Sequence, residues 1–156
     1  MPRELPVRDI MTTDVVTLHA DDSVEDAVHA LGTRGISGAP VVDADGRCVG
    51  VLDDSDLLLS EAKVHAPSAV EILGAYIPIP GTLRRFEDEV RHALARTVAD
   101  LMDPDAPWVR PEATVEDVAT AMVAHNVSRV PVLVDDHRVV GIVSRGDLVA
   151  AMGRGA

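Results

Sequence analysis

Two short stretches of the chain end in the same Asp-Leu pair but differ in the residues just before it. Residues 141–148 read GIVSRGDL, and residues 50–57 read GVLDDSDL. In the first stretch a hydroxyl (Ser144) and a carboxylate (Asp147) flank a guanidinium (Arg145). An ionised carboxylate is a strong acceptor for the two hydroxyls of a cis-diol, whereas a hydroxyl, a guanidinium and helix N-terminal amides suit an anion. These residue types therefore fit a ligand with a diol and a phosphate.

The second stretch carries the opposite charge at the corresponding positions. Asp53 and Asp54 stand where the first stretch has Ser144 and Arg145, while Asp56 keeps the place of Asp147. Two carboxylates repel a phosphate and supply no hydroxyl donor. The two stretches therefore predict unequal sites.

A structural role is the alternative at each of these positions. Asp56 and Asp147 fall close to the start of a predicted helix, where a carboxylate complements the helix dipole. Ser144 suits the N-cap of the same helix. Helix capping thus stands beside ligand binding as an explanation of the pattern.

The two stretches close two copies of one longer unit. Residues 7–59 align with residues 98–150 without a gap. The alignment matches VRDIM with VADLM, SVEDAVHAL with TVEDVATAM, and SGAPVV with SRVPVL. Two copies are too few for a solenoid, so we expect a pseudo-two-fold pair packed face to face.

Each copy has the same order of predicted elements. Short extended segments at 14–18 and 106–109 precede helices that begin after Ser23 and Thr114, each followed by an aspartate at the third helical position, as in a capping box. Two β-branched runs then flank a polar turn, DADG in the first copy and VDDH in the second, and a short helix follows. The order is strand, helix, strand, strand, helix.

Residues 63–97 lie between the copies and have no counterpart in the repeat. Their second part is a predicted amphipathic helix, with an apolar stripe at spacings of three and four residues formed by Leu83, Phe86, Val90, Leu94 and Val98. This helix packs on its own domain or across a homodimer, or it serves as a partner-binding arm or a ligand-gated lid.

Composition limits the classes of function. A net charge of −12 in 156 residues argues against a nucleic-acid-binding surface, which needs a basic stripe. No apolar run approaches the ~20 residues of a membrane span, and the single cysteine, Cys48, indicates a reducing compartment and a buried, inert thiol. We therefore expect a soluble cytoplasmic protein. It has no nucleophile–base pair, metal-ligand spacing or phosphate loop, so we do not expect an enzyme.

The repeated pattern resembles a pair of CBS domains, the cystathionine-β-synthase-type module. The resemblance rests on DIM or DLM, a helix, a proline before an apolar strand, and a glycine six residues before Asp-Leu. It implies an α+β fold of two pseudo-two-fold-related repeats, residues 7–62 and 98–153, in one module over residues 1–156. It also implies a homodimer, an unknown effector protein, and a cleft for AMP, ADP, ATP or S-adenosylmethionine.

The resemblance assigns two half-sites, in which the aspartate accepts from ribose hydroxyls and the serine contacts phosphate. In one half-site Ser144, Arg145 and Asp147 face the first copy at Val16, Ile36, Ser37 and Gly38. In the other, Asp56 faces the second copy at Val127, Ser128 and Arg129. Arg129 stands where related domains place a phosphate-binding arginine; a surface ion pair is its alternative role. The half-site at Asp56 is empty, holds an uncharged adenosyl group, or reaches phosphate through Mg²⁺.

These assignments predict a regulatory module that binds an adenosine-containing nucleotide between its repeats and signals to a partner protein. The alternative function is a homodimeric interaction scaffold whose cleft binds nothing. The residue pattern leaves the number of phosphates on the ligand open.

Overall fold

The computed structural model describes residues 2–61 and 96–154. The chain begins with two 3₁₀ turns, η1 (Pro2–Glu4) and η2 (Val7–Asp9). The first copy comprises β1 (Leu18–His19), α1 (Val24–Arg34), β2 (Ala39–Val42), β3 (Cys48–Leu52) and α2 (Asp54–Glu61). The second comprises α5 (Val98–Leu101), α6 (Val115–His125), β4 (Arg129–Val134), η3 (Asp135–His137), β5 (Arg138–Ser144) and α7 (Arg145–Arg154). The helix predicted within residues 63–97 lies outside the described residues, but Val98, the last residue of its predicted stripe, belongs to the separate helix α5, because Thr97 is extended and caps α5.

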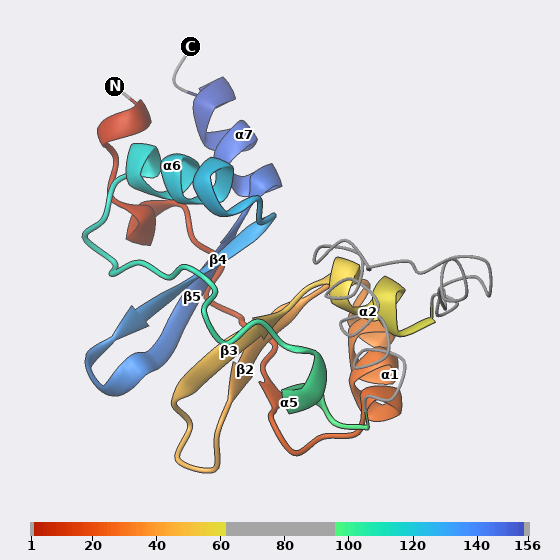
Figure 1. Ribbon diagram of the computed structural model, residues 1–156. Coiled ribbons are helices and arrows are strands. Elements are labelled where there is room, and N and C mark those ends of the chain that lie inside the picture. The colour runs from red at the N-terminus through yellow and green to blue at the C-terminus, as the bar shows by residue number, and fades with distance from the viewer. Residues whose placement is uncertain (1, 62–95, 155–156) are drawn as a thin grey trace, which may run out of the picture.

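Each copy is a small sheet with its helices on one side (Figure 1). In the first copy β1 is parallel to β2, and β2 is antiparallel to β3; in the second, β4 and β5 are antiparallel. Both hairpins shift register at the same point of the repeat, after Val41 and after Val132. A bridge between Arg47 and Arg138 joins the two hairpins. The predicted α+β pair of repeats is confirmed.

The first strand of each copy is shorter than predicted. The extended segment expected at 14–18 contributes its last residue to β1, which covers Leu18–His19. The segment expected at 106–109 forms an isolated parallel bridge between Val109 and Val132. Pro104 and Pro107 lack the backbone N–H that a sheet ladder needs, which accounts for the loss in the second copy. In the first copy the residues before Leu18 line a pocket.

The predicted helix starts are confirmed. The Ser23 hydroxyl accepts a hydrogen bond from the Asp26 amide (3.0 Å) at the start of α1. At the start of α6, Thr114 and Asp117 exchange two bonds: each backbone amide donates to the other side chain, at 2.9 and 3.1 Å. Each bond satisfies an amide that has no partner within its helix.

One apolar residue of α1 lies outside the core. Ala27 and Leu31 are buried, but Val28 is 48% exposed. The helix turns its Ala27–Leu31 edge towards the sheet, and Val28 lies one residue round the surface from that edge.

The two copies exchange a turn. The turn at the start of the first copy packs into the core of the second, and the turn at the start of the second copy packs into the core of the first. Val7 is fully buried among residues of α6, β4 and β5, and its amide donates to Ala113 (2.7 Å). Val98 is equally buried in the first copy, and its amide donates to Asp22 (2.9 Å). In Figure 1 the red N-terminal turns accordingly lie beside α6 and α7, and the green α5 lies with the first copy.

The same exchange explains the glycine that both opening stretches share. The segments that follow the exchanged turns bridge to the final strand of the opposite copy, Thr12 to Ile142 and Asp103 to Val51. A Cβ on Gly50 would lie 2.8 Å from the Asp103 carbonyl oxygen, and a Cβ on Gly141 would collide with the side chain of Met11. Both glycines therefore leave room for the segment that comes from the other copy.

Of the helices in the two described ranges, none is long and apolar enough to cross a membrane.

The exchanged turns can be tested with a matched pair of valine substitutions. Val7→Ala removes two buried methyl groups and leaves a cavity, so we expect the free energy of unfolding to fall by about 2 kcal/mol. Val28→Ala deletes the same atoms at a half-exposed position and should change it by less than about 0.5 kcal/mol. Urea unfolding measures both. Equal effects from the two variants would contradict the exchanged core.

Candidate functional site

A pocket of about 190 Å³ lies between the two copies. One wall comes from the first copy and the other from β4, β5 and the start of α7. The lining residues are Thr12, Asp14, Val15, Val16, Ile36, Gly38, Arg129, Ile142, Ser144 and Asp147. The pocket therefore combines an apolar wall, a guanidinium, a hydroxyl and two carboxylates.

Most of the first predicted half-site comes together in this pocket. Val16, Ile36 and Gly38 face Ser144 and Asp147 across it, as the repeat pattern predicted. The pocket also contains four residues that the sequence did not assign, Thr12, Asp14, Val15 and Ile142. Ile142 could have been found, because residues two apart on a strand share a face with Ser144. The other three enter through the exchange of segments, which leaves no local sequence signal.

Ser144 and Asp147 form a capping box at the start of α7. The Ser144 amide donates to Asp147 Oδ2 (2.9 Å), and the Asp147 amide donates to the Ser144 hydroxyl (3.2 Å). The structural alternative is therefore real for both residues. The capping role leaves hydrogen-bonding capacity for a ligand, since the Ser144 hydroxyl only accepts in the capping box and can still donate its proton. In the part of the chain that the structure describes, nothing donates to Asp147 Oδ1.

Arg145 lies elsewhere. Its backbone amide donates to the Ser128 carbonyl (3.0 Å), and its guanidinium extends towards the Val127 carbonyl (3.4 Å). The side chain lines a separate, apolar groove between α6 and α7. Val127, predicted for the second half-site, thus contacts Arg145 of its own copy. The structure does not bring Arg145 to the pocket that holds Ser144 and Asp147.

Arg129 spans the interface between the copies. Its Nη1 donates to the Gly38 carbonyl (2.9 Å), and its Nη2 donates to the Ser37 hydroxyl (2.7 Å). A Cβ on Gly38 would lie 3.1 Å from the Arg129 Cζ and 2.5 Å from the Leu52 carbonyl oxygen, so glycine is needed for this approach. Of the alternative role considered for Arg129, the ion pair is present, since Nη2 lies 3.6 Å from Asp53 Oδ1, but it is not at the surface, because the Arg129 side chain is 13% exposed. Arg129 was predicted for one half-site, but it also lines the other.

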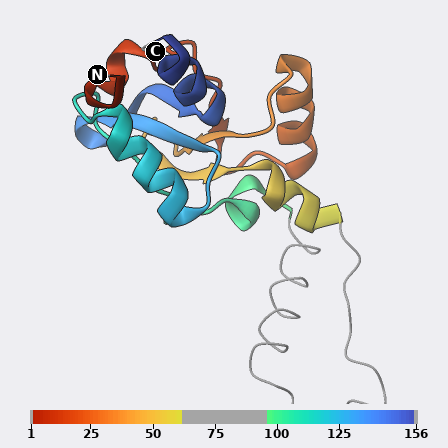
Figure 2. The same ribbon diagram turned by 90° about the horizontal axis from the view of Figure 1, so that it is seen from above.

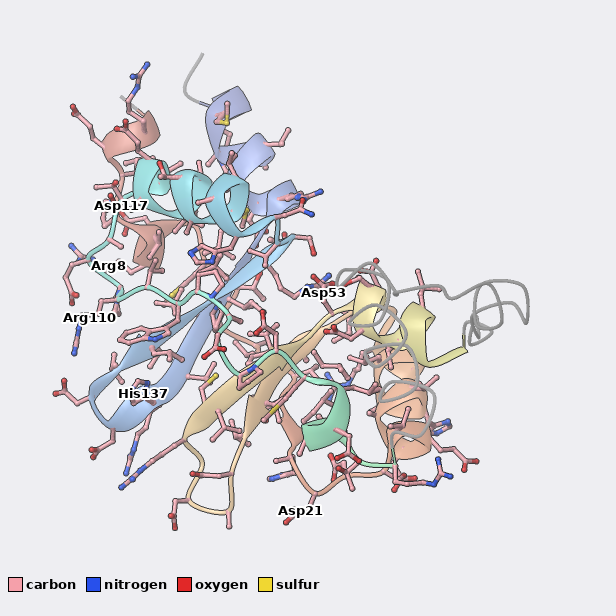
Figure 3. All side chains as sticks on the ribbon, in the orientation of Figure 1. Arg8, Asp21, Asp53, Arg110, Asp117 and His137 are labelled. Carbon is pink, nitrogen blue, oxygen red and sulfur yellow. The ribbon has the colours of Figure 1, made fainter. Side chains whose placement is uncertain are left out.

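The second half-site contains its own carboxylate. Asp53 accepts from the Ser128 hydroxyl at both oxygens (3.1 and 3.3 Å) and lies 3.6 Å from Arg129 Nη2. Asp56 accepts from the Asp53 amide (3.0 Å), just as Asp147 accepts from Ser144. Figure 3 shows Asp53 at the end of β3, beside the second copy. Sequence comparison marked Asp53 as a departure from the pattern but did not reveal its partners.

Comparison with protein families matches the CBS domain to residues 7–63 and again to residues 98–154. The chain belongs to the CBS domain family. The uncharacterized protein MJ1426 of Methanocaldococcus jannaschii is 30% identical over 152 residues, which cover 94% of this chain and 90% of that protein. This CBS pair therefore matches a relative of nearly the same length along its whole course.

Solved CBS pairs have the same fold. CBSX2 of Arabidopsis thaliana, in a crystal structure with AMP, has a TM-score of 0.76 and 28% identity, and covers 96% of this chain and 97% of its own. The CBS pair of MJ0100, in complex with 5′-methylthioadenosine and S-adenosyl-L-methionine, has a TM-score of 0.69 and 25% identity, covering 96% and 100%. Both comparisons extend over both repeats, so the pairing of the repeats, as well as each repeat, is shared.

The pKa of Asp53 lies below its ordinary value. Burial raises the pKa of this carboxyl, but hydrogen bonds from Asp54, the positive charge of Arg129 and the Ser128 hydroxyl together lower it by more. The hydrogen bonds and the charge of Arg129 favour the ionised form of Asp53, whereas burial disfavours it. Asp53 is therefore an anion at neutral pH and balances the charge of Arg129 inside the CBS pair.

The single cysteine, Cys48, is half-buried, whereas a buried thiol was predicted. Its partial burial raises the pKa of the thiol, which disfavours the thiolate. Within residues 2–61 and 96–154, no group of three or more His, Cys, Asp or Glu side chains is placed to hold a metal ion. Magnesium bridging to a bound polyphosphate stays a prediction.

The Asp53 ion pair predicts a pH dependence of stability. Because the pKa of Asp53 is lowered by folding, its contribution is complete above the ordinary carboxyl value of 3.8 and is lost as the pH falls through the folded value. Asp53→Asn should therefore cost about 1–3 kcal/mol at pH 7 and progressively less below pH 3.8. Urea unfolding at pH 7 and pH 3 measures the difference.

The control for this measurement is Asp21→Asn, which removes a carboxylate at an exposed position far from Asp53 (Figure 3). It should change the free energy of unfolding by less than about 0.5 kcal/mol at either pH. An Asp53→Asn cost that is the same at both pH values would contradict the assigned ion pair.

Proposed function

We propose that this CBS pair is a regulatory module that binds an adenosine-containing ligand in the pocket between its repeats. The observation that carries the proposal is the convergence of Ser144 and Asp147 with Val16, Ile36 and Gly38 on one pocket. The complexes of CBSX2 with AMP and of MJ0100 with two adenosyl ligands support the ligand class.

Three groups of pocket residues contact three parts of the ligand: the ribose, the adenine ring and the phosphate or carboxylate group. Asp147 Oδ1 accepts from the ribose diol, as a charged acceptor suited to two hydroxyls. The apolar side chains of Ile36, Val16 and Ile142 flank the adenine ring. The Ser144 hydroxyl lies on the polar side and supplies a donor to a phosphate or carboxylate group of the ligand.

Charge favours a ligand with few phosphates. Asp14 and Asp147 both line the pocket, whereas its one arginine, Arg129, is already paired with Asp53. Each further phosphate would add repulsion from these carboxylates. We therefore rank AMP and S-adenosylmethionine ahead of ADP, and ATP last unless Mg²⁺ accompanies it.

Regulation follows from the position of the ligand between the repeats. A ligand that touches both repeats changes their relative arrangement if it binds one arrangement more tightly than another. An effector protein would read that change, and the module itself performs no catalysis. A cytoplasmic location stays a prediction from the cysteine content.

Calorimetric titration with AMP, ADP, ATP and S-adenosylmethionine tests the function. We expect binding by the wild type and a 10–100-fold loss of affinity in Asp147→Ala, because a hydrogen-bonded charge contributes about 1.5–3 kcal/mol. Asp117→Ala is the matched control: it removes the same capping interaction from α6, away from the pocket (Figure 3). Its affinity should stay within about twofold of the wild type. Absence of binding by the wild type to all four compounds would overturn the proposal.

A second candidate function rests on the apolar groove between α6 and α7. The groove is lined by Ala119, Met122, Val123, Asn126, Arg145, Leu148, Val149 and Met152. Val123 is 84% exposed and Val149 is 68% exposed. In the first copy, the corresponding face of α1 and α2 exposes Val28 (48%) and Leu58 (70%). A second copy of the chain carries the same two apolar faces, one on α1 and α2 and one on α6 and α7, so it could cover both. This surface therefore supports the expected homodimer, with or without a ligand.

Sedimentation of the purified chain tests the homodimer. Val149→Glu places a charge in the groove and should raise the dimer dissociation constant at least about tenfold, equivalent to ~1.4 kcal/mol. Ala150→Glu adds the same charge at the next exposed position of α7, outside the groove, and should leave the dimer intact. A monomeric wild type, or equal effects of the two variants, would contradict this interface.

A further inference from the structure

We propose that the Asp53 carboxylate is the resident anion of the second half-site, where it takes the place of a ligand phosphate. The chain then binds one adenosine nucleotide, and replacing Asp53 by serine opens a second site. This inference rests on the proposed function, since it assumes that the half-sites share a ligand class.

The repeat places Asp53 and Ser144 at equivalent positions. Both follow the last strand of their copy directly, and the backbone amide of each donates to an aspartate three residues later, Asp56 or Asp147. The first position presents a small hydroxyl to an open pocket, whereas the second presents a carboxylate to the opposite copy. The two half-sites therefore share a frame and differ in the group that fills it.

The partners of Asp53 are groups that bind phosphate oxygens. The Ser128 hydroxyl donates to both carboxylate oxygens, and the Arg129 guanidinium lies 3.6 Å from one of them. A hydroxyl and a guanidinium around two oxygens of one anion form the contact set that a terminal phosphate would need. Arg129 Nη2 lies 3.5 Å from the Ser128 hydroxyl oxygen, so the two groups meet beside the same carboxylate.

Burial makes the anion necessary. The Arg129 side chain is 13% exposed and that of Asp53 is 18% exposed, so the guanidinium has little water around it. The Arg129 Nε is buried and has no hydrogen-bond partner among the described residues. A largely desolvated cation with incomplete partners needs a nearby negative charge, and removal of that charge favours the entry of another anion.

The second half-site is the better anion site once Asp53 is removed. It holds Ser128 and Arg129 where the first has Ser37 and Gly38, so the arginine belongs to the sequence of this half-site. A serine at position 53 reproduces Ser144, and Asp56 already has the backbone contact of Asp147. Serine is also a favoured N-cap, so α2 keeps its start in the variant.

The experiment is AMP titration of the full chain by calorimetry, with the number of sites per chain as the readout. The wild type should bind one AMP, and Asp53→Ser should bind two. Asp54→Ser, which removes a neighbouring exposed carboxylate, should bind one. Circular dichroism establishes that each variant is folded. Should Asp53→Ser fail to fold, Asp53→Asn keeps the shape and an N-cap side chain while removing the charge, and should also bind two.

Each stoichiometry decides a separate claim. One AMP in both the wild type and the folded Asp53 variants overturns the resident anion but leaves the proposed function standing. Two in the wild type overturns it as well. No AMP in the wild type but one in Asp53→Ser supports the resident anion, and places the nucleotide site in the second half-site alone. No AMP in either protein overturns the resident anion, whereas the proposed function is overturned only if the other three compounds also fail to bind.

Titration with adenosine, which lacks the phosphate, distinguishes whether Asp53 acts through its charge or through its volume. If Asp53 acts as an anion, the site gained in Asp53→Ser needs the phosphate, and adenosine should bind it at least about tenfold more weakly than AMP. Equal affinity of adenosine and AMP for the gained site would mean that Asp53 merely fills space, which overturns its role as a phosphate substitute.

Discussion

The core of each repeat is filled in part by a turn that the chain forms before it reaches the other repeat. Val7 packs among the helices and strands of the second copy, and Val98 does so in the first. Because these turns run on into the bridges at Thr12 and Asp103, the exchange also fixes the two segments that border the space between the copies. Hydrophobic burial thus places the first wall of the pocket, while the strand ends place the second. The site is a by-product of how the two cores are completed. In Figure 2 the red N-terminal turns lie beside the blue α7, and the green α5 lies beside the yellow α2.

Within that frame, electrostatics distinguishes two halves whose hairpins and closing helices correspond. Arg129 reaches the first copy at Gly38 and Ser37 and is balanced by Asp53. One side of the interface is closed by charge pairing, and the other remains open around Ser144. A duplicated fold has therefore lost its chemical symmetry through a few side chains, without any change in how the two repeats pack.

Much of this was predictable from the chain because the repeat acted as an internal alignment. Periodicity and capping residues located α1, α6 and the hairpins, and the resemblance to CBS domains assigned Val16, Ile36, Gly38, Ser144 and Asp147 to one half-site. Other features depend on contacts between segments distant in sequence. Asp14 and Thr12 enter the pocket through the exchange, Arg145 turns to its own copy, and Asp53 finds partners in β4. None of these has a local signature, because each depends on the relative placement of two bodies that a one-dimensional pattern leaves open.

The exchanged turns also bear on how the protein folds. A fragment that ended after α2 would carry the turn that the second repeat needs and would lack the turn that fills its own core. The reverse holds for a fragment that began at α5. Neither repeat is therefore an autonomous folding unit, and loss of one removes apolar support from the other. The unfolding of the pair should be a single cooperative transition, and a disturbance at either end of the chain is shared by both halves.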